Sequence, residues 1–179
     1  MTVKNPKCLV VDASVLRAAK KANAIHPVPI MCRDFLDEIF KSGHKVIMTP
    51  EIKVEWDKHI RSNFAKDWYF NMLKRGRLLV VQKNVIDDNL RQLILDITAP
   101  DVINAVTKDM RLIEAALQAD EIISSLDDKM RGHFKRAALK IDEIQSVVWI
   151  NPINADEDCI IWLRQSCPPD DFRLLSYQD

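Results

Sequence analysis

Short apolar runs that alternate with helical segments constrain the fold of this chain most. The runs cover residues 8–12, 45–48, 78–81, 121–126 and 147–150. Runs of this length without polar alternation are typical of strands buried on both faces, and strands separated by helices form parallel sheets covered by helices. The sequence therefore predicts an α/β fold: a three-layer α/β/α sandwich around a mostly parallel sheet of about five strands.

The segments between these runs show helical patterns. Helices are expected over residues 14–22, 31–42, 50–63, 68–75, 84–119 with a break at 99–100, 128–139 and 156–165. Residues 26–29, His-Pro-Val-Pro, indicate a rigid break before the second helix. No linker or internal repeat is visible, so we expect a single domain over residues 1–179, ending in a C-terminal helix and polar tail from about residue 155.

The composition narrows the class of protein. With 26 basic and 26 acidic residues the formal net charge is zero, so a nucleic-acid-binding surface would have to be local. The 3 glycines argue against a Gly-rich phosphate loop. The cysteines are scattered without a CxxC pair, which favours a reduced intracellular protein without zinc. With no signal peptide and no apolar membrane span in the pattern, we expect a cytoplasmic protein without a membrane partner.

Two carboxylates stand where predicted strands end. Asp12 directly follows the apolar run Leu-Val-Val at 9–11, and Asp127 follows the run that ends at residue 126. Open α/β sheets place their chemistry at the carboxyl ends of the strands. Ser125 lies near the end of the second of these strands, where its hydroxyl can orient a carboxylate or a water. Asp128 is adjacent to Asp127, and one of the two neighbouring aspartates is expected to cap the following helix.

Two further acids lie on predicted helices. Glu55 is beyond the first turn of the helix that starts at Thr49-Pro50, so the helix dipole does not explain it. The alternative for Glu55 is a surface residue paired with Lys58 or His59. Asp109 shares a helical face with apolar positions 112, 113 and 116, and its alternative is a helix N-cap. Glu114 points to another face and is expected to be solvated.

Clustered acids of this kind indicate a cation site. Ionised carboxylates repel one another, and burying them together is costly without a cation. Hard oxygen ligands without a soft partner select Mg²⁺ or Mn²⁺. Such a centre can activate water for displacement at a phosphodiester.

The ordered set of motifs resembles the PIN-domain ribonucleases. It comprises Leu-Val-Val-Asp-Ala-Ser-Val-Leu at 9–16, Thr49-Pro50 with Glu55, and Asp109 followed by Ile-Ile-Ser-Ser-Leu-Asp at 122–127. The resemblance covers residues 8 to about 150. It implies a PIN-like sandwich that cleaves single-stranded RNA with Mg²⁺ or Mn²⁺, in which Asp12, Glu55, Asp109 and Asp127 are the catalytic and metal-site acids, supported by Ser14, Ser125 and Asp128. Lys129 stands where the family often has another acid.

Basic residues flank the predicted acids. Those expected to contact RNA phosphates are Lys53, Lys58, Lys129 and Arg131. The default interpretation of the basic run from 129 to 136 is a solvated helix face. The resemblance also suggests a toxin of a toxin–antitoxin pair, and the partners considered are single-stranded RNA, an antitoxin protein and a second copy of the chain.

Two functions from different classes follow. The first is a metal-dependent endoribonuclease, for which the resemblance implies 5′-phosphate and 3′-hydroxyl products. The alternative is a catalytically inactive PIN-fold module that binds RNA or protein. Lys129 in place of an acid and the neutral net charge favour this alternative.

Overall fold

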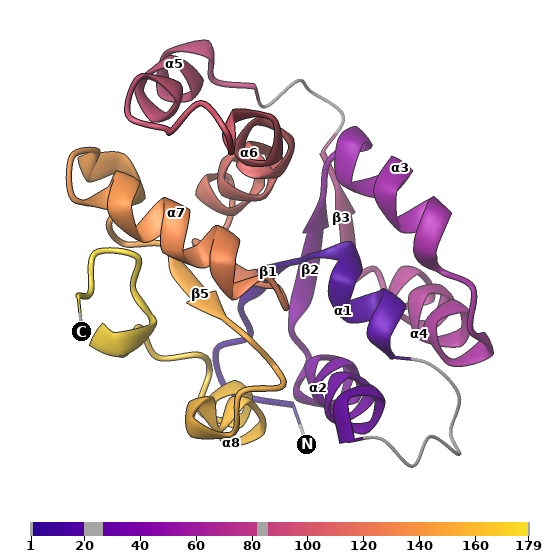
Figure 1. Ribbon diagram of the computed structural model, residues 1–179. Helices are drawn as coiled ribbons and strands as arrows, with labels where there is room; N and C mark the ends of the chain where they lie inside the picture. The colour runs from indigo at the N-terminus through magenta and orange to yellow at the C-terminus, as the bar shows by residue number, and fades with distance from the viewer. Residues whose placement is uncertain (1, 20–26, 82–85, 179) are drawn as a thin grey trace.

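The sheet of the protein confirms the predicted architecture. The structure, a computed structural model, describes residues 2–19, 27–81 and 86–178. Five parallel strands form one sheet in the order β3-β2-β1-β4-β5 (Figure 1). They are β1 (Cys8–Val11), β2 (Lys45–Met48), β3 (Leu78–Val80), β4 (Ile122–Ser124) and β5 (Val148–Ile150).

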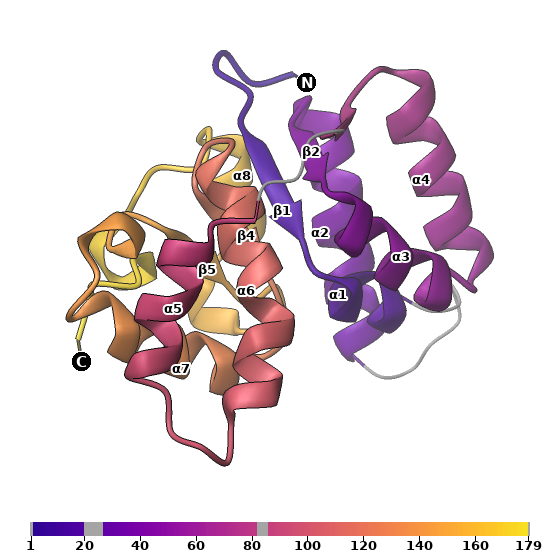
Figure 2. The same cartoon turned by 90° about the horizontal axis from the view of Figure 1, so that it is seen from above.

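Helices cover the two faces of this sheet. The elements are α1 (Ala13–Ala18), α2 (Pro27–Ser42), α3 (Pro50–His59), α4 (Asn63–Lys74), α5 (Asp88–Asp96), α6 (Ile103–Leu117), α7 (Asp128–Ala138) and α8 (Cys159–Arg164), with 3-10 turns η1 (Asp142–Ile144), η2 (Ala155–Glu157) and η3 (Asp171–Arg173). Helices α1 to α4 lie on one side of β1 and α5 to α7 on the other (Figure 2). The chain is thus a three-layer α/β/α sandwich.

The register of β1 and β4 sets up the site. Leu9 pairs with Ile122 and Val11 pairs with Ser124, so the two strands end level with each other. The backbone N–H of Asp12 then donates to the carbonyl of Ser124 at 2.9 Å. Side chains that follow these strands are therefore brought to one edge of the sheet, as parallel topology requires.

Local signals explain most helix boundaries. Polar caps begin α1, α3, α4, α5 and α7, and the capping residues are Asp12, Thr49, Ser62, Asp87 and Asp127. The cap at Ser62 divides the predicted helix 50–63 from its successor, which starts at residue 63 and not at 68. Gly43 ends α2 at φ +88°, a left-handed conformation that glycine adopts without strain.

Three sequence expectations need correction or a limit. Pro27 and Pro29 do not break the chain but form the first turn of α2, where a missing N–H costs no helical hydrogen bond. Glu114 is not solvated: it is 3% exposed and holds a bidentate pair with Arg91 at 2.6 and 2.7 Å. The predicted helical positions 20–22 and 84–85 lie outside the described residues, as does His26.

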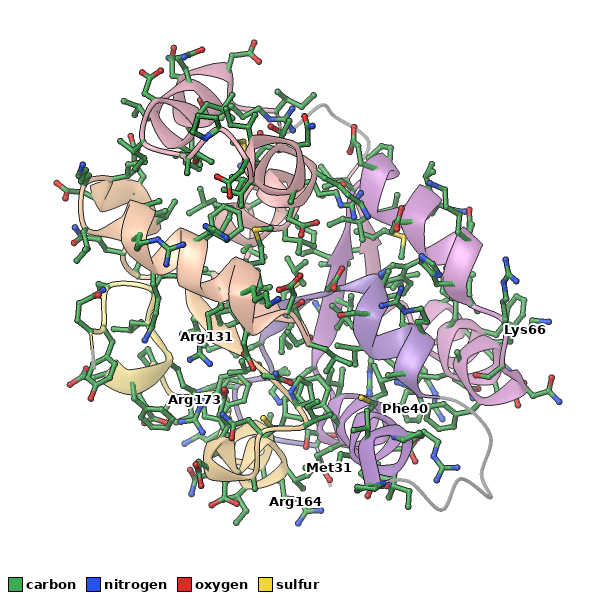
Figure 3. All side chains as sticks on the ribbon, viewed as in Figure 1. Met31, Phe40, Lys66, Arg131, Arg164 and Arg173 are labelled. Carbon is green, nitrogen blue, oxygen red and sulfur yellow. The ribbon has the colours of Figure 1, made fainter. Side chains whose placement is uncertain are left out.

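The C-terminal segment is docked against the sheet and is not simply a polar tail. Leu174 forms an antiparallel bridge with Val148, and the N–H of Leu175 donates to the carbonyl of Val147 at 2.9 Å. Figure 3 labels Arg173 in this segment and Arg131 on α7, on the same side of the molecule. Both guanidinium groups bond to Glu157, the first to its carbonyl and the second to its carboxylate.

Three buried tryptophans contribute to the core. Trp56, Trp149 and Trp162 are among the largest fully buried side chains. The indole of Trp56 donates to the carbonyl of Val11 at 2.9 Å, which ties α3 to the end of β1. Among the described residues, no helix is long and apolar enough to cross a membrane.

Candidate active site

A cavity of about 790 Å³ opens at the carboxyl ends of β1 and β4. All four predicted acids line it. The ionisable residues in its wall are the acids Asp12, Glu55, Asp109, Asp127 and Asp128 and the bases Arg17, His59, Lys108, Arg111 and Lys129. The structure therefore brings together acids that lie far apart in the sequence, and it surrounds them with a similar number of basic groups.

Asp12 is held by two serine hydroxyls. Its Oδ2 accepts a bond from Ser125 Oγ at 3.0 Å and a short one from Ser14 Oγ, and it also accepts from the Ser14 N–H at 3.3 Å as the cap of α1. Ser14 Oγ in turn accepts from the N–H of Leu126 at 3.1 Å. Both serines predicted to support the site thus connect the end of β1 to the end of β4.

Asp127 and Asp128 are placed by α7 and by β5. Asp127 caps α7 and accepts from the N–H of Met130 at 2.8 Å. Asp128 accepts from Asn151 Nδ2 at 2.8 Å. Asn151 follows β5 and is 3% exposed, and sequence analysis missed it. Its signal was a polar residue directly after a predicted buried strand, at the same edge of the sheet as Asp12.

Asp109 lies in the body of α6 and is not an N-cap. Burial and the charge of Asp12 raise the pKa of Asp109 from 3.8 to about 6, against the opposing charges of Arg111 and Lys108, and Asp127 raises it further. The nearest Arg111 nitrogen is 3.8 Å from Asp109 Oδ1. Burial and the two acids that follow β1 and precede α7 therefore disfavour the ionised form of Asp109.

Glu55 has its own cations. Its carboxylate lies 3.3 Å from Lys58, 3.2 Å from His59 and 3.3 Å from Lys108 of α6. Burial raises the pKa of Glu55, but the hydrogen bonds from Lys108 and Lys58 outweigh it and bring the pKa down to about 2. The alternative predicted for Glu55, pairing with Lys58 or His59, agrees with these contacts. Glu55 nevertheless also lines the cavity.

The four predicted RNA contacts have different surroundings. Lys129 lines the cavity. Lys53 is paired with Asp57 at 2.6 Å, and Arg131 is paired with Glu157 at 2.6 Å. Lys58 is bonded to Glu55. Of the four, Lys129 alone is among the residues of the cavity wall. RNA contact by all four stays a prediction.

Three basic residues of the cavity wall were not singled out from the sequence. They are Arg17, Lys108 and Arg111. Two of them flank Asp109 on α6, and Arg17 is one helical turn beyond Ser14. Lys108 and Arg111 lie three residues apart, as do Ser14 and Arg17, and this spacing, which places residues on one helical face, was the available signal.

The donor set suits a hard cation in its chemistry. Carboxylate oxygens of Asp12, Asp109 and Asp127 are ligands that Mg²⁺ and Mn²⁺ prefer, and a cation would offset the burial and the neighbouring acids that raise the pKa of Asp109. In the described part of the chain, no three Asp, Glu, His or Cys side chains are grouped as a ready-made metal site. Holding a cation therefore requires these side chains to turn toward it.

Comparison with known proteins adds no assignment. No known protein family, no curated protein and no solved structure matches this chain significantly. The case for a function therefore depends on the residues of the cavity and on the resemblance carried by the sequence motifs.

Proposed function

We propose that the chain is a metal-dependent endoribonuclease that hydrolyses phosphodiester bonds of single-stranded RNA with Mg²⁺ or Mn²⁺. One observation carries this proposal: Asp12, Asp109 and Asp127, from three different elements, line one cavity at the carboxyl edge of a parallel sheet. Burial in the first place, and then the charges of Asp12 and Asp127, raise the pKa of Asp109. A site that keeps a carboxylate in such surroundings is poised for a cation.

The proposed roles follow from the contacts. A bound divalent cation would activate water and stabilise charge on the phosphate. Ser14 and Ser125 fix the carboxylate of Asp12, and Asp109 and Asp127 complete the acidic set with it. Lys129 and Arg17 in the cavity wall provide positive charge for the RNA backbone. Hydrolysis would leave a 5′-phosphate and a 3′-hydroxyl, as the resemblance to the PIN-domain ribonucleases implies.

A second candidate is a catalytically inactive PIN-fold module that binds RNA or protein. The pairing of Glu55 with Lys58 and Lys108 favours it, because these two cations of the protein already neutralise this acid. In this alternative the basic groups of the cavity serve binding, and no cation is needed.

The partner expectations stay predictions. An antitoxin and the role of a toxin depend on the resemblance alone. The expectation of a homodimer depends on apolar exposure around α5, where Leu93 is 47% exposed and Ile97 is 39% exposed. Sedimentation of the wild-type protein and of Leu93→Glu tests this contact.

The proposed function is tested by cleavage of a fluorescent single-stranded RNA in Mn²⁺ or Mg²⁺, with EDTA as a control. Asp12→Asn keeps the size of the side chain and removes its charge. Asp67→Asn is the matched control, because Asp67 is exposed on α4 and lies outside the cavity. Cleavage that needs the cation and is lost only in Asp12→Asn supports the nuclease. Cleavage that survives Asp12→Asn would exclude the proposed site, and RNA binding without cleavage would favour the inactive module.

A further inference from the structure

The guanidinium group of Arg111 is mostly buried, and it has no hydrogen-bond partner among the described residues. Its side chain is 13% exposed and lines the cavity. Its Nε is buried without a partner, and its closest carboxylate oxygen, in Asp109, is 3.8 Å from Nη2, too far for a hydrogen bond. Within the described residues, Arg111 therefore donates no hydrogen bond of ordinary length.

Other buried arginines of the protein form short hydrogen bonds to carboxylates. Arg91 binds Glu114 through two nitrogens at 2.6 and 2.7 Å. Arg131 reaches Glu157 at 2.6 Å and the carbonyl of Phe172 at 3.2 Å. These arginines hold the fold together through short bonds. The Nε of Arg131 is also buried without a partner, so this atom alone does not distinguish Arg111. Arg111 differs from both arginines because, among the described residues, no short bond to the protein accounts for its position in the cavity wall.

A largely buried cation without hydrogen bonds to the protein costs free energy unless water or a ligand satisfies its donors. The planar fork of a guanidinium matches the oxygens of a phosphate through two parallel hydrogen bonds. Lys108 and Lys129 in the same wall add positive charge. The unsatisfied donors therefore fit an anion in this cavity, beside the acids and distinct from any cation that the acids hold.

We propose that Arg111 anchors an anion subsite that takes a phosphodiester of single-stranded RNA next to the acids of the cavity. This inference rests on the proposed function, which it deepens by naming the residue that grips the substrate backbone. The competing explanation is that Arg111 only balances the charge of Asp109. The two explanations differ in what happens to RNA binding when no divalent cation is present.

The test is the affinity for a short fluorescein-labelled oligouridine, measured by fluorescence anisotropy in EDTA at several salt concentrations. Arg111→Gln removes the charge, and Arg111→Lys keeps the charge but removes the fork. We expect both variants to bind roughly three- to tenfold more weakly. The slope of log affinity against log salt should decrease by about 0.7 in Arg111→Gln and stay unchanged in Arg111→Lys.

The matched control is Arg75→Gln. Arg75 is exposed at the end of α4, shortly before β3, and so lies at the amino edge of the sheet, opposite the cavity. Its affinity and salt slope should equal those of the wild type. Thermal melting verifies folding, and Arg111→Lys carries the test if Arg111→Gln does not fold.

The inference is overturned if Arg111→Gln binds RNA as the wild type does, or if the wild type does not bind the oligouridine in EDTA. Unchanged RNA binding with tighter Mn²⁺ binding in Arg111→Gln would show that Arg111 only balances Asp109. If Arg111→Gln loses RNA binding while the wild type shows no cleavage of RNA, the anion subsite is supported and the proposed nuclease activity is overturned. Metal-dependent cleavage with unchanged affinity in Arg111→Gln would do the reverse.

Discussion

The hydroxyl of Ser125 donates to Oδ2 of Asp12 across 3.0 Å. The same hydroxyl accepts the backbone N–H of Asp127 at 3.2 Å. One side chain at the end of β4 therefore connects the acid that follows β1 to the acid that caps α7. This link makes the relative position of two candidate ligands a property of the sheet, not of a flexible loop.

Ser125→Ala should reduce the activity of the site while the protein still folds. We expect metal-dependent cleavage to decrease by about 10- to 100-fold, since losing a partner that orients a ligand typically has this effect. Ser124→Ala is the matched control, because Ser124 is buried on β4 and, among the described residues, its hydroxyl bonds to the carbonyl of Val10, at 3.3 Å, and to no residue of the cavity. If the two variants cleave RNA equally well, the hydroxyl of Ser125 has no role in the site.

Asp109→Asn should stabilise the protein while it inactivates the site. Because the pKa of Asp109 is raised from 3.8 to about 6, its ionised form opposes folding at higher pH. The variant should gain roughly 1 to 3 kcal/mol in the free energy of unfolding near neutral pH. The gain should grow as pH rises from 3.8 to about 6 and then level off. Urea unfolding of both proteins across this range measures this gain. A variant less stable than the wild type at pH 7 would contradict the raised pKa of Asp109.

The pair of Arg91 and Glu114 should stabilise α5 on α6, the helix that carries Asp109 and Arg111. Arg91→Ala leaves a carboxylate with a 2% exposed side chain without its cation, and should cost about 3–5 kcal/mol of unfolding free energy. Glu114→Ala should cost less, roughly 1–3 kcal/mol, because the side chain of Arg91 is 25% exposed and can reach water. Urea unfolding compares the two, and the opposite order would show that the pair is not held as described.

His44 should make stability depend on pH. Its ring accepts the N–H of Lys7 at 2.9 Å on Nδ1, and Nε2 lies 2.9 Å from the carbonyl of Leu163. Burial lowers the pKa of His44 below 6.5, against opposing effects of Leu163 and Glu38.

The unfolded chain therefore takes up a proton near pH 6.5 that the folded protein resists. Stability from the neutral ring is complete above pH 6.5 and is lost as pH falls below it. Chemical unfolding between about pH 7 and pH 5 should show a steeper decrease for the wild type than for His44→Gln. Parallel curves would mean that His44 does not titrate as its surroundings imply.

The sequence was sufficient for the sheet and for the placement of Asp12 and Asp127. Buried parallel strands are nearly continuous apolar runs, so their ends, and the residues that follow, can be found without knowledge of the fold. The partners of Glu55 could be predicted only in part. Lys58 and His59 lie within one helical turn, whereas Lys108 reaches it from another helix, and that contact depends on how α3 and α6 pack.

Burial was harder to predict than the order of elements. Glutamate usually lies at the surface, so nothing in the sequence indicated that Glu114 would be buried. Its bond to Arg91 from α5 offsets the cost of burying the carboxylate. The first turn of α2 contains Pro27 and Pro29, which also occur in rigid breaks, so the pattern alone did not distinguish the two. The surroundings of Arg111 could not be predicted from the sequence either, because whether a guanidinium has hydrogen-bond partners depends on the three-dimensional structure.

The most direct test of the account is a crystal of the protein soaked in Mn²⁺ and measured for anomalous scattering. We expect a peak in the cavity, contacted by carboxylate oxygens of Asp12 and of Asp109 or Asp127 at about 2.1 Å. The same soak of Asp12→Asn should lose the peak. Strong Mn²⁺ peaks elsewhere with none among these acids, in crystals whose cavity is open to solvent, would contradict the claim that this is a metal-dependent nuclease.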